Sequence, residues 1–323
     1  MIRFLINRLG GSLVVLLIMS FIIYGLIGLM PGDPIDEMIA ANPDLTSEDV
    51  AHLKSLHGLD KPIMERYGNW LSAALGGDFG YSRIHARPAL EILMPHLWNT
   101  TVLMSIVMAL SLAIAIPLGV AAAYKPNSFL DYGANLISFA GISVPPFWLA
   151  LLAIIIFSVT LGWFPAGGME TVGDGSLGDR ARHMVLPVMV LTLHTVGGYT
   201  RFIRASMIQT LRQDFIRTAR AKGMSDIRLL IHHALRNAIL PLVTVVALGF
   251  GSLFSGALIT ETMFSWLGVG KLIFDSILGN DFNLALVGLL FATLMTLIGN
   301  IIADIAYTWV DPRIDLAAGA GRA

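Results

Sequence analysis

Six long stretches without a charged residue constrain this chain more than any other feature of its sequence. They contain no Asp, Glu, Lys or Arg, and they cover residues 9–32, 97–124, 132–169, 183–200, 237–260 and 282–303. Each is near or above the roughly 18 apolar residues that a helix needs to cross a bilayer. Only 13% of the residues are charged, against roughly 25% in a soluble globular domain. The sequence therefore predicts an all-α, polytopic membrane protein with six transmembrane helices in a single transmembrane domain, residues 1–323.

The distribution of basic residues predicts which segments face the cytoplasm. Arg3 and Arg8 precede the first run, which ends without a signal-peptide cleavage pattern, so we expect this run to remain as a span. Segment 201–236 carries eight basic and two acidic residues, whereas segment 33–96 carries five basic and ten acidic residues. Cytoplasmic loops are the basic ones. We therefore expect both termini and a 201–236 loop in the cytoplasm, with 33–96 outside the cell.

Two other segments have their own patterns. The run 132–169 is longer than one span, so we end the third helix near Gly162, before Pro165. The extracytoplasmic loop 33–96 predicts two short amphipathic helices. Thr46 and Asp49 resemble a capping box that opens the first, and the second has apolar residues at helical spacing, namely Ile63, Tyr67, Trp70, Leu71 and Ala74. These helices either pack on the outer ends of the spans or bind a partner.

The chain lacks the motifs of several other protein classes. It has no cysteine, which excludes disulfides and thiol catalysis. Gly270-Lys271 is not a phosphate-binding loop, because Ser265 and Leu272 occupy the positions that require Gly and Ser or Thr. The net charge of −1 gives no indication of nucleic-acid binding. We assign no catalytic residue, metal or cofactor to this chain.

Ionisable residues within membrane spans are candidates for function by default. His194 lies well inside the fourth run, where it either lines a substrate path or makes a hydrogen bond between helices. Glu261 lies at the end of the fifth run, where capping or snorkelling is the alternative to a place in the pathway. Both are retained as candidate translocation-pathway residues.

Segment 214–241 is long for a loop and has the pattern of a helix, a glycine break and a second helix. Phe215, Ile216 and Ala219 give the first helix a small apolar face, and Gly223 interrupts it. The second helix has an apolar stripe at Ile227, Leu230, Ile231, Ala234 and Leu235. Such an amphipathic element binds either a protein groove or anionic membrane lipid.

At these residues the sequence resembles a known family. TARAKG at 218–223 and HALRNAILP at 233–241 resemble the EAA-type loop of permease subunits in binding-protein-dependent ABC importers, specifically the first permease of the dipeptide, oligopeptide and nickel branch. The resemblance extends along the chain through PGDP at 31–34, HGLDKP at 57–62, GDFGYS at 77–82, FSVTLGWFPAGG at 157–168, ETMFSWLGVGKL at 261–272 and VDPRIDL at 310–316.

The resemblance implies the transmembrane domain of a type I ABC importer in the bacterial inner membrane. It implies a second homologous permease, an extracytoplasmic solute-binding protein, and two ATPase subunits that bind ATP and magnesium in place of this non-catalytic chain. By this resemblance, the loop that couples the permease to the ATPase consists of Phe215, Arg217, Thr218, Ala219, Arg220, Ala221, Lys222, Gly223 and Met224. Arg217 and Thr218 depart from the Glu and Ala of the general pattern.

The substrate and the mode of transport have alternatives. Di- or oligopeptides are the first expectation from the resemblance, and nickel chelates, glutathione-like peptides and short oligosaccharides stay open. The alternative function is a stand-alone secondary transporter driven by an ion gradient. The scarcity of carboxylates within the spans and the lack of visible inverted repeats count against it.

Overall fold

The structure is a computed structural model that describes residues 2–29 and 61–310, and within these ranges it contains helices and no named strand. The all-α expectation is therefore confirmed. The elements, in chain order, are α1 (Ile2–Ile27), α4 (Ile63–Leu75), α5 (Ala89–Tyr124), α6 (Phe129–Ser143), α7 (Pro146–Ala153), the π-helix η1 (Ile154–Thr160), α8 (Leu177–Leu211), α9 (Asp214–Ala221), α10 (Asp226–Arg228), the π-helix η2 (Leu229–Leu235), α11 (Arg236–Ala238), α12 (Leu240–Met263), α13 (Val269–Leu278) and α14 (Phe282–Val310).

Several of these helices are suited to crossing a membrane. In the described ranges, three stretches are long and apolar enough, Ile6–Ile27, Ala89–Tyr124 and Phe282–Ile302, and the pair formed by α6 with α7 and η1 is a fourth if it counts as one span. The remaining expected spans correspond to α8, with 35 residues, and α12, with 24 residues. The total of six spans stays a prediction for these two helices.

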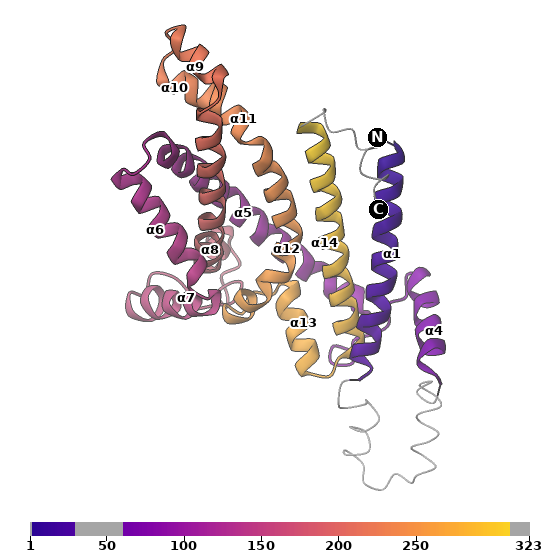
Figure 1. Cartoon of the computed structure of the whole chain (residues 1–323). Helices are drawn as coiled ribbons and strands as arrows, with labels where there is room; N and C mark the ends of the chain where they lie inside the picture. The colour runs from indigo at the N-terminus through magenta and orange to yellow at the C-terminus, as the bar shows by residue number, and fades with distance from the viewer. Residues whose placement is uncertain (1, 30–60, 311–323) are drawn as a thin grey trace, which may run out of the picture.

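The third predicted span is broken. Helices α6 and α7–η1 meet at an angle of 101°, so the expectation of one continuous helix from 132 to about 162 is wrong. Val144 has an extended backbone, with φ −89° and ψ 125°, and Pro145 follows it. A residue before proline is disfavoured in the helical conformation, which explains the break at this position. Figure 1 shows α7 lying across the direction of α6 and α8.

The long helices form one bundle. Helix α5 packs along α8, α12 along α14, and α1 on the far side of α14. Nε of Arg8 in α1 lies 3.1 Å from a carboxylate oxygen of Asp304 in α14, so an ion pair reinforces the last of these contacts. Figure 1 shows α9 and α10 at one end of the bundle and α7 and α13 at the other.

Helices α6 and α8 approach each other closely because both carry glycine at the contact. A Cβ atom at Gly197 would lie 2.5 Å from the carbonyl oxygen of Ser138, and one at Gly141 would overlap the carbonyl of Leu193. Small residues at a helix interface allow this approach of two backbones in a membrane protein. This contact fixes α6 against the middle of α8.

The second predicted outer helix is confirmed as α4. Its Tyr67 ring packs edge-on against Phe21 of α1, with ring centroids 5.2 Å apart, and Trp70 packs on Tyr24. The Tyr67 hydroxyl also shares a hydrogen bond of 2.8 Å with the Ser20 hydroxyl. These contacts favour packing on a span over partner binding for α4. The first predicted helix, from Thr46, lies outside the described residues.

Two predicted loop boundaries differ from the structure. Helix α5 begins at Ala89, inside the expected 33–96 loop, because Pro88 precedes it and Glu91 in its first turn complements the positive end of the helix dipole. Helix α8 continues to Leu211, so Arg201 and Arg204 lie on a helix and not in the expected 201–236 loop. The segment between α12 and α14 contains a further helix, α13, that we did not predict.

Candidate functional site

The segment after α8 forms a helical hairpin, in which Gly223 makes the turn. Gly223 has φ +76°, a left-handed conformation that favours glycine. The N–H of Gly223 donates to the carbonyl of Arg220 at 3.0 Å, and that of Met224 donates to the carbonyl of Ala219 at 3.4 Å. This pair of bonds is a Schellman motif that ends α9. The predicted helix, glycine break and second helix are confirmed.

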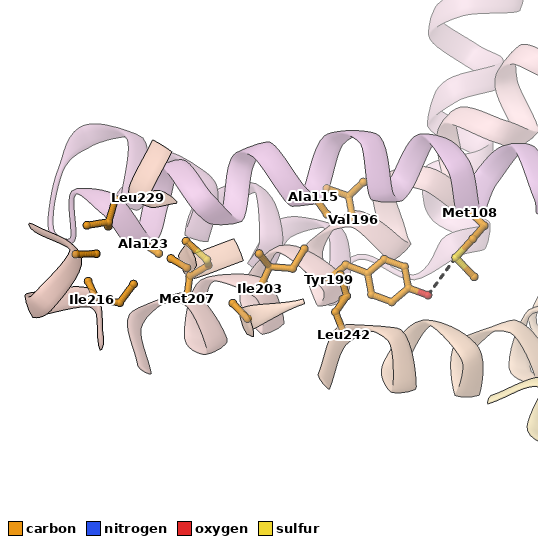
Figure 2. Close-up of a cluster of buried hydrophobic side chains, with 13 residues drawn as sticks. Met108, Ala115, Ala123, Val196, Tyr199, Ile203, Met207, Ile216, Leu229 and Leu242 are labelled. Carbon is orange, nitrogen blue, oxygen red and sulfur yellow. Dashed lines mark hydrogen bonds between the residues drawn. The ribbon is translucent and has the colours of Figure 1, made fainter. Parts of the chain in front are cut away.

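One face of α9 is part of the hydrophobic core. Ile216 and Ala219 are buried in a cluster with Met207 of α8 and Leu229 of the following π-helix. Figure 2 shows this cluster running along α5 and α8, with Ile216 and Leu229 at one end and Met108 and Tyr199 at the other. Burial of this face makes α9 a rigid extension of α5 and α8.

The other face of α9 is exposed and basic. Phe215 is 42% exposed, and further exposed side chains are those of Arg217, Thr218, Arg220, Ala221 and Lys222. Met224 is half-buried and packs against the core cluster. Ala219, which the family resemblance placed in the coupling loop, is 7% exposed and packs inside its own chain. Its small size serves the contact between α9 and the bundle.

The second half of the hairpin confirms part of the predicted apolar stripe, since Ala234 is buried and Leu230 and Leu235 pack against the core cluster. In contrast, Ile227 is 73% exposed and Ile231 is also exposed. Residues 229–235 form a π-helix, η2. A π-helix has i→i+5 hydrogen bonds, so side chains fall out of the α-helical phase that the prediction assumed.

Hydrogen bonds also fix the hairpin to the bundle. The hydroxyl of Tyr124, the last residue of α5, donates to Asp226 at 2.8 Å. The hydroxyl of Ser206 in α8 donates to the carbonyl of Ala238 at 2.8 Å. Movement of the hairpin is therefore coupled mechanically to both α5 and α8.

Glu261 caps α13 from the end of α12. It is fully buried, and its carboxylate accepts hydrogen bonds from the Thr100 hydroxyl at 2.6 Å and from the N–H groups of Gly270 and Lys271 at 2.7 and 3.2 Å. A Cβ atom at Gly268 would overlap this carboxylate. The structure thus gives Glu261 the capping role that was the alternative to a place in the pathway.

His194 makes the contact between helices that was the alternative to a pathway role. Its Nδ1 lies 3.2 Å from the carbonyl oxygen of Gly141 in α6, and the side chain is half-buried. Since this bond joins α6 and α8 at their close glycine contact, His194 contributes to packing between these helices.

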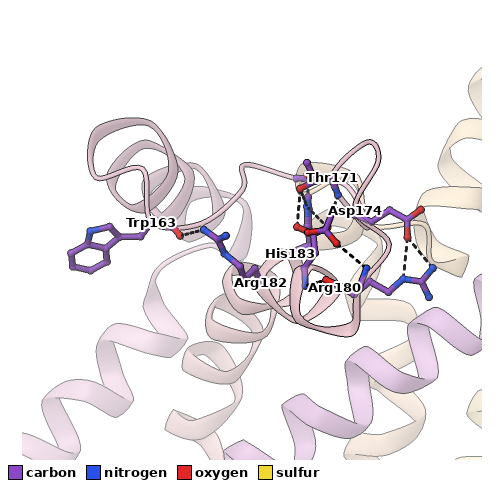
Figure 3. A network of polar contacts seen from close by, with 10 residues as sticks. Trp163, Thr171, Asp174, Arg180, Arg182 and His183 are labelled. Atoms are coloured by element: carbon purple, nitrogen blue, oxygen red, sulfur yellow. Dashed lines mark hydrogen bonds and ion pairs between the residues drawn. The ribbon is translucent and has the colours of Figure 1, made fainter.

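A buried polar network at the opposite end was not predicted. The carboxylate of Asp179 accepts the N–H of Thr171 at 2.5 Å and its hydroxyl at 2.8 Å. These bonds lower the pKa of Asp179 below its usual range. Nδ1 of His183 lies 3.1 Å from the carbonyl of Gly167, and Figure 3 shows His183 beside Thr171. The i,i+4 spacing of Asp179 and His183 was the sequence signal that could have predicted this network. The network fixes the loop before α8.

Two family matches together cover residues 1–316 of the chain. Residues 115–316 match the family described as the binding-protein-dependent transport system inner membrane component, and residues 1–116 match the N-terminal part of that membrane component. The chain is 38% identical, over 98% of its length and 100% of the relative, to the oligopeptide transport system permease protein AppB of Bacillus subtilis (strain 168). It is 37% identical to a putative peptide permease protein of Brucella suis biovar 1, over 97% of this chain and 99% of that one.

The fold also resembles a solved transporter. Inward-facing structures of the MetNI methionine ABC transporter match with TM-scores of 0.50 and 0.51 at 15% and 14% identity. The matches cover 67% of this chain and 96% and 97% of those chains. The chain therefore shares its fold with a chain of this ABC transporter. With matches along nearly its whole length, the chain belongs to the binding-protein-dependent transport system inner membrane component family.

Proposed function

We propose that this chain forms half of a peptide translocation pathway and that α9 receives the motion of separate ATPase subunits. The observation that carries the proposal is the division of α9 into two faces. Ile216 and Ala219 lie in the core, whereas Phe215, Arg217 and Lys222 are exposed. A short helix fixed on one face and exposed on the other can fill a groove of a partner and transmit a rigid-body displacement.

The chemistry of the exposed face fits a protein groove with an acidic rim. Phe215 offers an apolar anchor, and the guanidinium groups of Arg217 and Arg220 offer paired donors for carboxylates. Arg217 contacts Asp214 at 3.4 Å, but both side chains are strongly exposed, so this weak pair does not prevent a new contact. Met224 and Gly223 complete the proposed coupling segment by shaping its turn.

The remaining components of the transporter follow from the same proposal. A second homologous permease supplies the other half of the pathway, two ATPase subunits bind ATP and magnesium, and this chain catalyses no reaction and holds no cofactor. The basic residues around α9 favour a cytoplasmic position for it and for both termini. The opposite end, with α13 and the loop before α8, would then meet a solute-binding protein outside the cytoplasm.

The substrate class in this proposal is peptides. It is supported by the names of two relatives that match along nearly the whole chain, an oligopeptide transport system permease protein and a putative peptide permease protein. If a solute-binding protein selects the ligand, the pathway itself needs little specificity. Peptides of different sequence are therefore expected to pass.

Cross-linking tests the proposal directly because the chain contains no cysteine. A single Phe215→Cys or Thr218→Cys variant, purified from native membranes in its complex, should form a cross-link to an ATPase subunit with a short thiol-directed reagent. Val172→Cys is the matched control, since Val172 is fully exposed in the loop before α8, at the other end of the bundle.

The same variants test orientation. A membrane-impermeant thiol reagent applied to intact cells should label Val172→Cys and leave Thr218→Cys unlabelled until the membrane is opened. Cross-linking of Val172→Cys to the ATPase, or external labelling of Thr218→Cys, would contradict the proposed position of α9.

A further inference from the structure

A groove lies between α6 and α8 near the end of α8 that leads into the hairpin. Its volume is about 570 Å³, and its lining includes Asn135 and Phe139 of α6 and Gly198, Arg201 and Arg204 of α8. Phe139, Gly198 and Arg201 are exposed, so the groove opens on the surface of the bundle. A Cβ atom at Gly198 would meet nothing within 4 Å, which leaves that part of the groove empty.

The two arginines of the groove differ in their partners. Nε and Nη2 of Arg204 donate to the two carboxylate oxygens of Asp131 at 2.5 and 2.8 Å. Asp131 also accepts hydrogen bonds from the N–H of Asn127 and the side-chain amide of Asn135. Its charge is therefore fully engaged with Arg204 and its neighbours.

Arg201 supplies the unbalanced charge of the groove. Its guanidinium carbon lies 5.1 Å from the centre of the Phe139 ring, a cation–π contact. Within residues 2–29 and 61–310, this guanidinium donates no hydrogen bond. Because Asp131 neutralises Arg204, the groove has a net positive charge, which the exposed Arg201 carries.

The charge pattern of α8 indicates that the groove lies where the span ends, at the level of the lipid head groups. Arg201 directly follows the uncharged run 183–200, and the surface of α6 beside it carries the exposed apolar side chains of Leu136 and Phe139. Basic pockets between transmembrane helices at the membrane surface are suited to anionic head groups. A soluble anion would gain nothing from the apolar surface, whereas the acyl chains of a lipid would cover it.

We propose that this groove binds an anionic phospholipid. The guanidinium of Arg201 donates to the phosphate oxygens, in the paired geometry that arginine offers to phosphate, the head group fills the space over Gly198, and an acyl chain lies along Leu136 and Phe139. This site is separate from the proposed coupling face of α9, so either proposal can fail without the other.

Native mass spectrometry of the purified complex tests the site. The complex is incorporated into bilayers of equal amounts of phosphatidylglycerol and phosphatidylcholine, released, and examined for retained lipid. The wild type should retain phosphatidylglycerol selectively. Arg201→Gln should retain about tenfold less, since it loses a charge-assisted contact to phosphate. Gly198→Leu should show a similar loss with every charge intact, because its side chain fills the groove.

Arg212→Gln is the matched control, because Arg212 is an exposed arginine on the turn between α8 and α9 that does not line the groove. It should retain lipid as the wild type does. Undiminished retention in both Arg201→Gln and Gly198→Leu, with unchanged melting temperatures, would overturn the proposal. So would an equal loss in Arg212→Gln, or full displacement of the lipid by inorganic phosphate.

Discussion

The guanidinium group of Arg204 on α8 holds both carboxylate oxygens of Asp131 on α6, at 2.5 and 2.8 Å. Asp131 is buried and its partner is partly exposed. Together with the glycine contact near His194, this pair fixes α6 to α8 at two levels. An ion pair with a buried member is costly to break, because removal of one partner leaves an uncompensated charge.

Arg204→Gln is therefore expected to destabilise the protein. We expect a loss of about 2 kcal/mol in unfolding free energy, less than for a fully buried pair because the guanidinium retains some solvent contact. The matched control is Arg217→Gln, which removes an arginine from the exposed pair with Asp214 and should change stability by less than about 0.5 kcal/mol. Denaturant unfolding in detergent measures both, and equal effects would contradict the structural distinction.

Gly223→Val is expected to uncouple transport from ATP hydrolysis. Valine in the left-handed conformation costs about 1–2 kcal/mol, so the turn after α9 should rearrange while the bundle remains folded. Gly223→Asn is the control, since asparagine tolerates this conformation. Uptake and ATPase activity of the reconstituted complex give the result: valine should lower uptake more than hydrolysis, and asparagine should preserve both. Normal uptake in Gly223→Val would argue against coupling through this turn.

Glu261→Ala is expected to destabilise the end of the bundle that contains α13. The substitution leaves the buried N–H groups of Gly270 and Lys271 without their acceptor, which should cost about 3 kcal/mol. Glu91→Ala removes an exposed carboxylate in the first turn of α5 that pairs with Arg87, so it should cost less than about 1 kcal/mol. Thermal unfolding compares them. If Glu261→Ala keeps wild-type stability but loses uptake, the capping role is contradicted and Glu261 is a residue of the translocation pathway.

The Asp179 network is expected to open in acid. Its hydrogen bonds from Thr171 lower the pKa of Asp179, so the folded loop is stabilised above the ordinary pKa of aspartate, about 3.9. That contribution is lost as the pH falls through the lower folded-state value. Asp179→Asn should show at neutral pH the exposure that the wild type shows only in acid. Hydrogen exchange of residues 167–183 across pH measures this, and unchanged exchange in Asp179→Asn would refute the role of the carboxylate.

Local rules predicted the features that depend on a few neighbouring residues. Gly223 was identified as the break because a helix end with a left-handed residue favours glycine, and α4 was identified from the spacing of Tyr67 and Trp70. The break after Val144 had a visible signal in Pro145-Pro146, but the proline pair does not specify a turn of 101°. Packing of α7 against α8 and α12 determines that direction.

Features that depend on distant contacts or unusual helices were not predicted. Glu261 accepts a hydrogen bond from Thr100, which lies 161 positions away in the sequence. No pattern in either segment predicts this contact. The phase of Ile227 and Ile231 was wrong because hydrophobic periodicity assumes 3.6 residues in each turn, which the π-helix η2 does not follow. The inward position of Ala219 depends on Met207 and Leu229, which only the folded chain brings together.

Helix α5 has 36 residues, which corresponds to a length of about 54 Å. Thr100 in its N-terminal half bonds to Glu261, and its last residue, Tyr124, bonds to the hairpin that contains α9. A helix that spans the whole molecule in this way acts as a lever. A tilt of about 5° around one end displaces the other by about 5 Å, close to one helical turn. A small tilt of α5 around its N-terminal end would therefore displace α9, at the opposite end, much further.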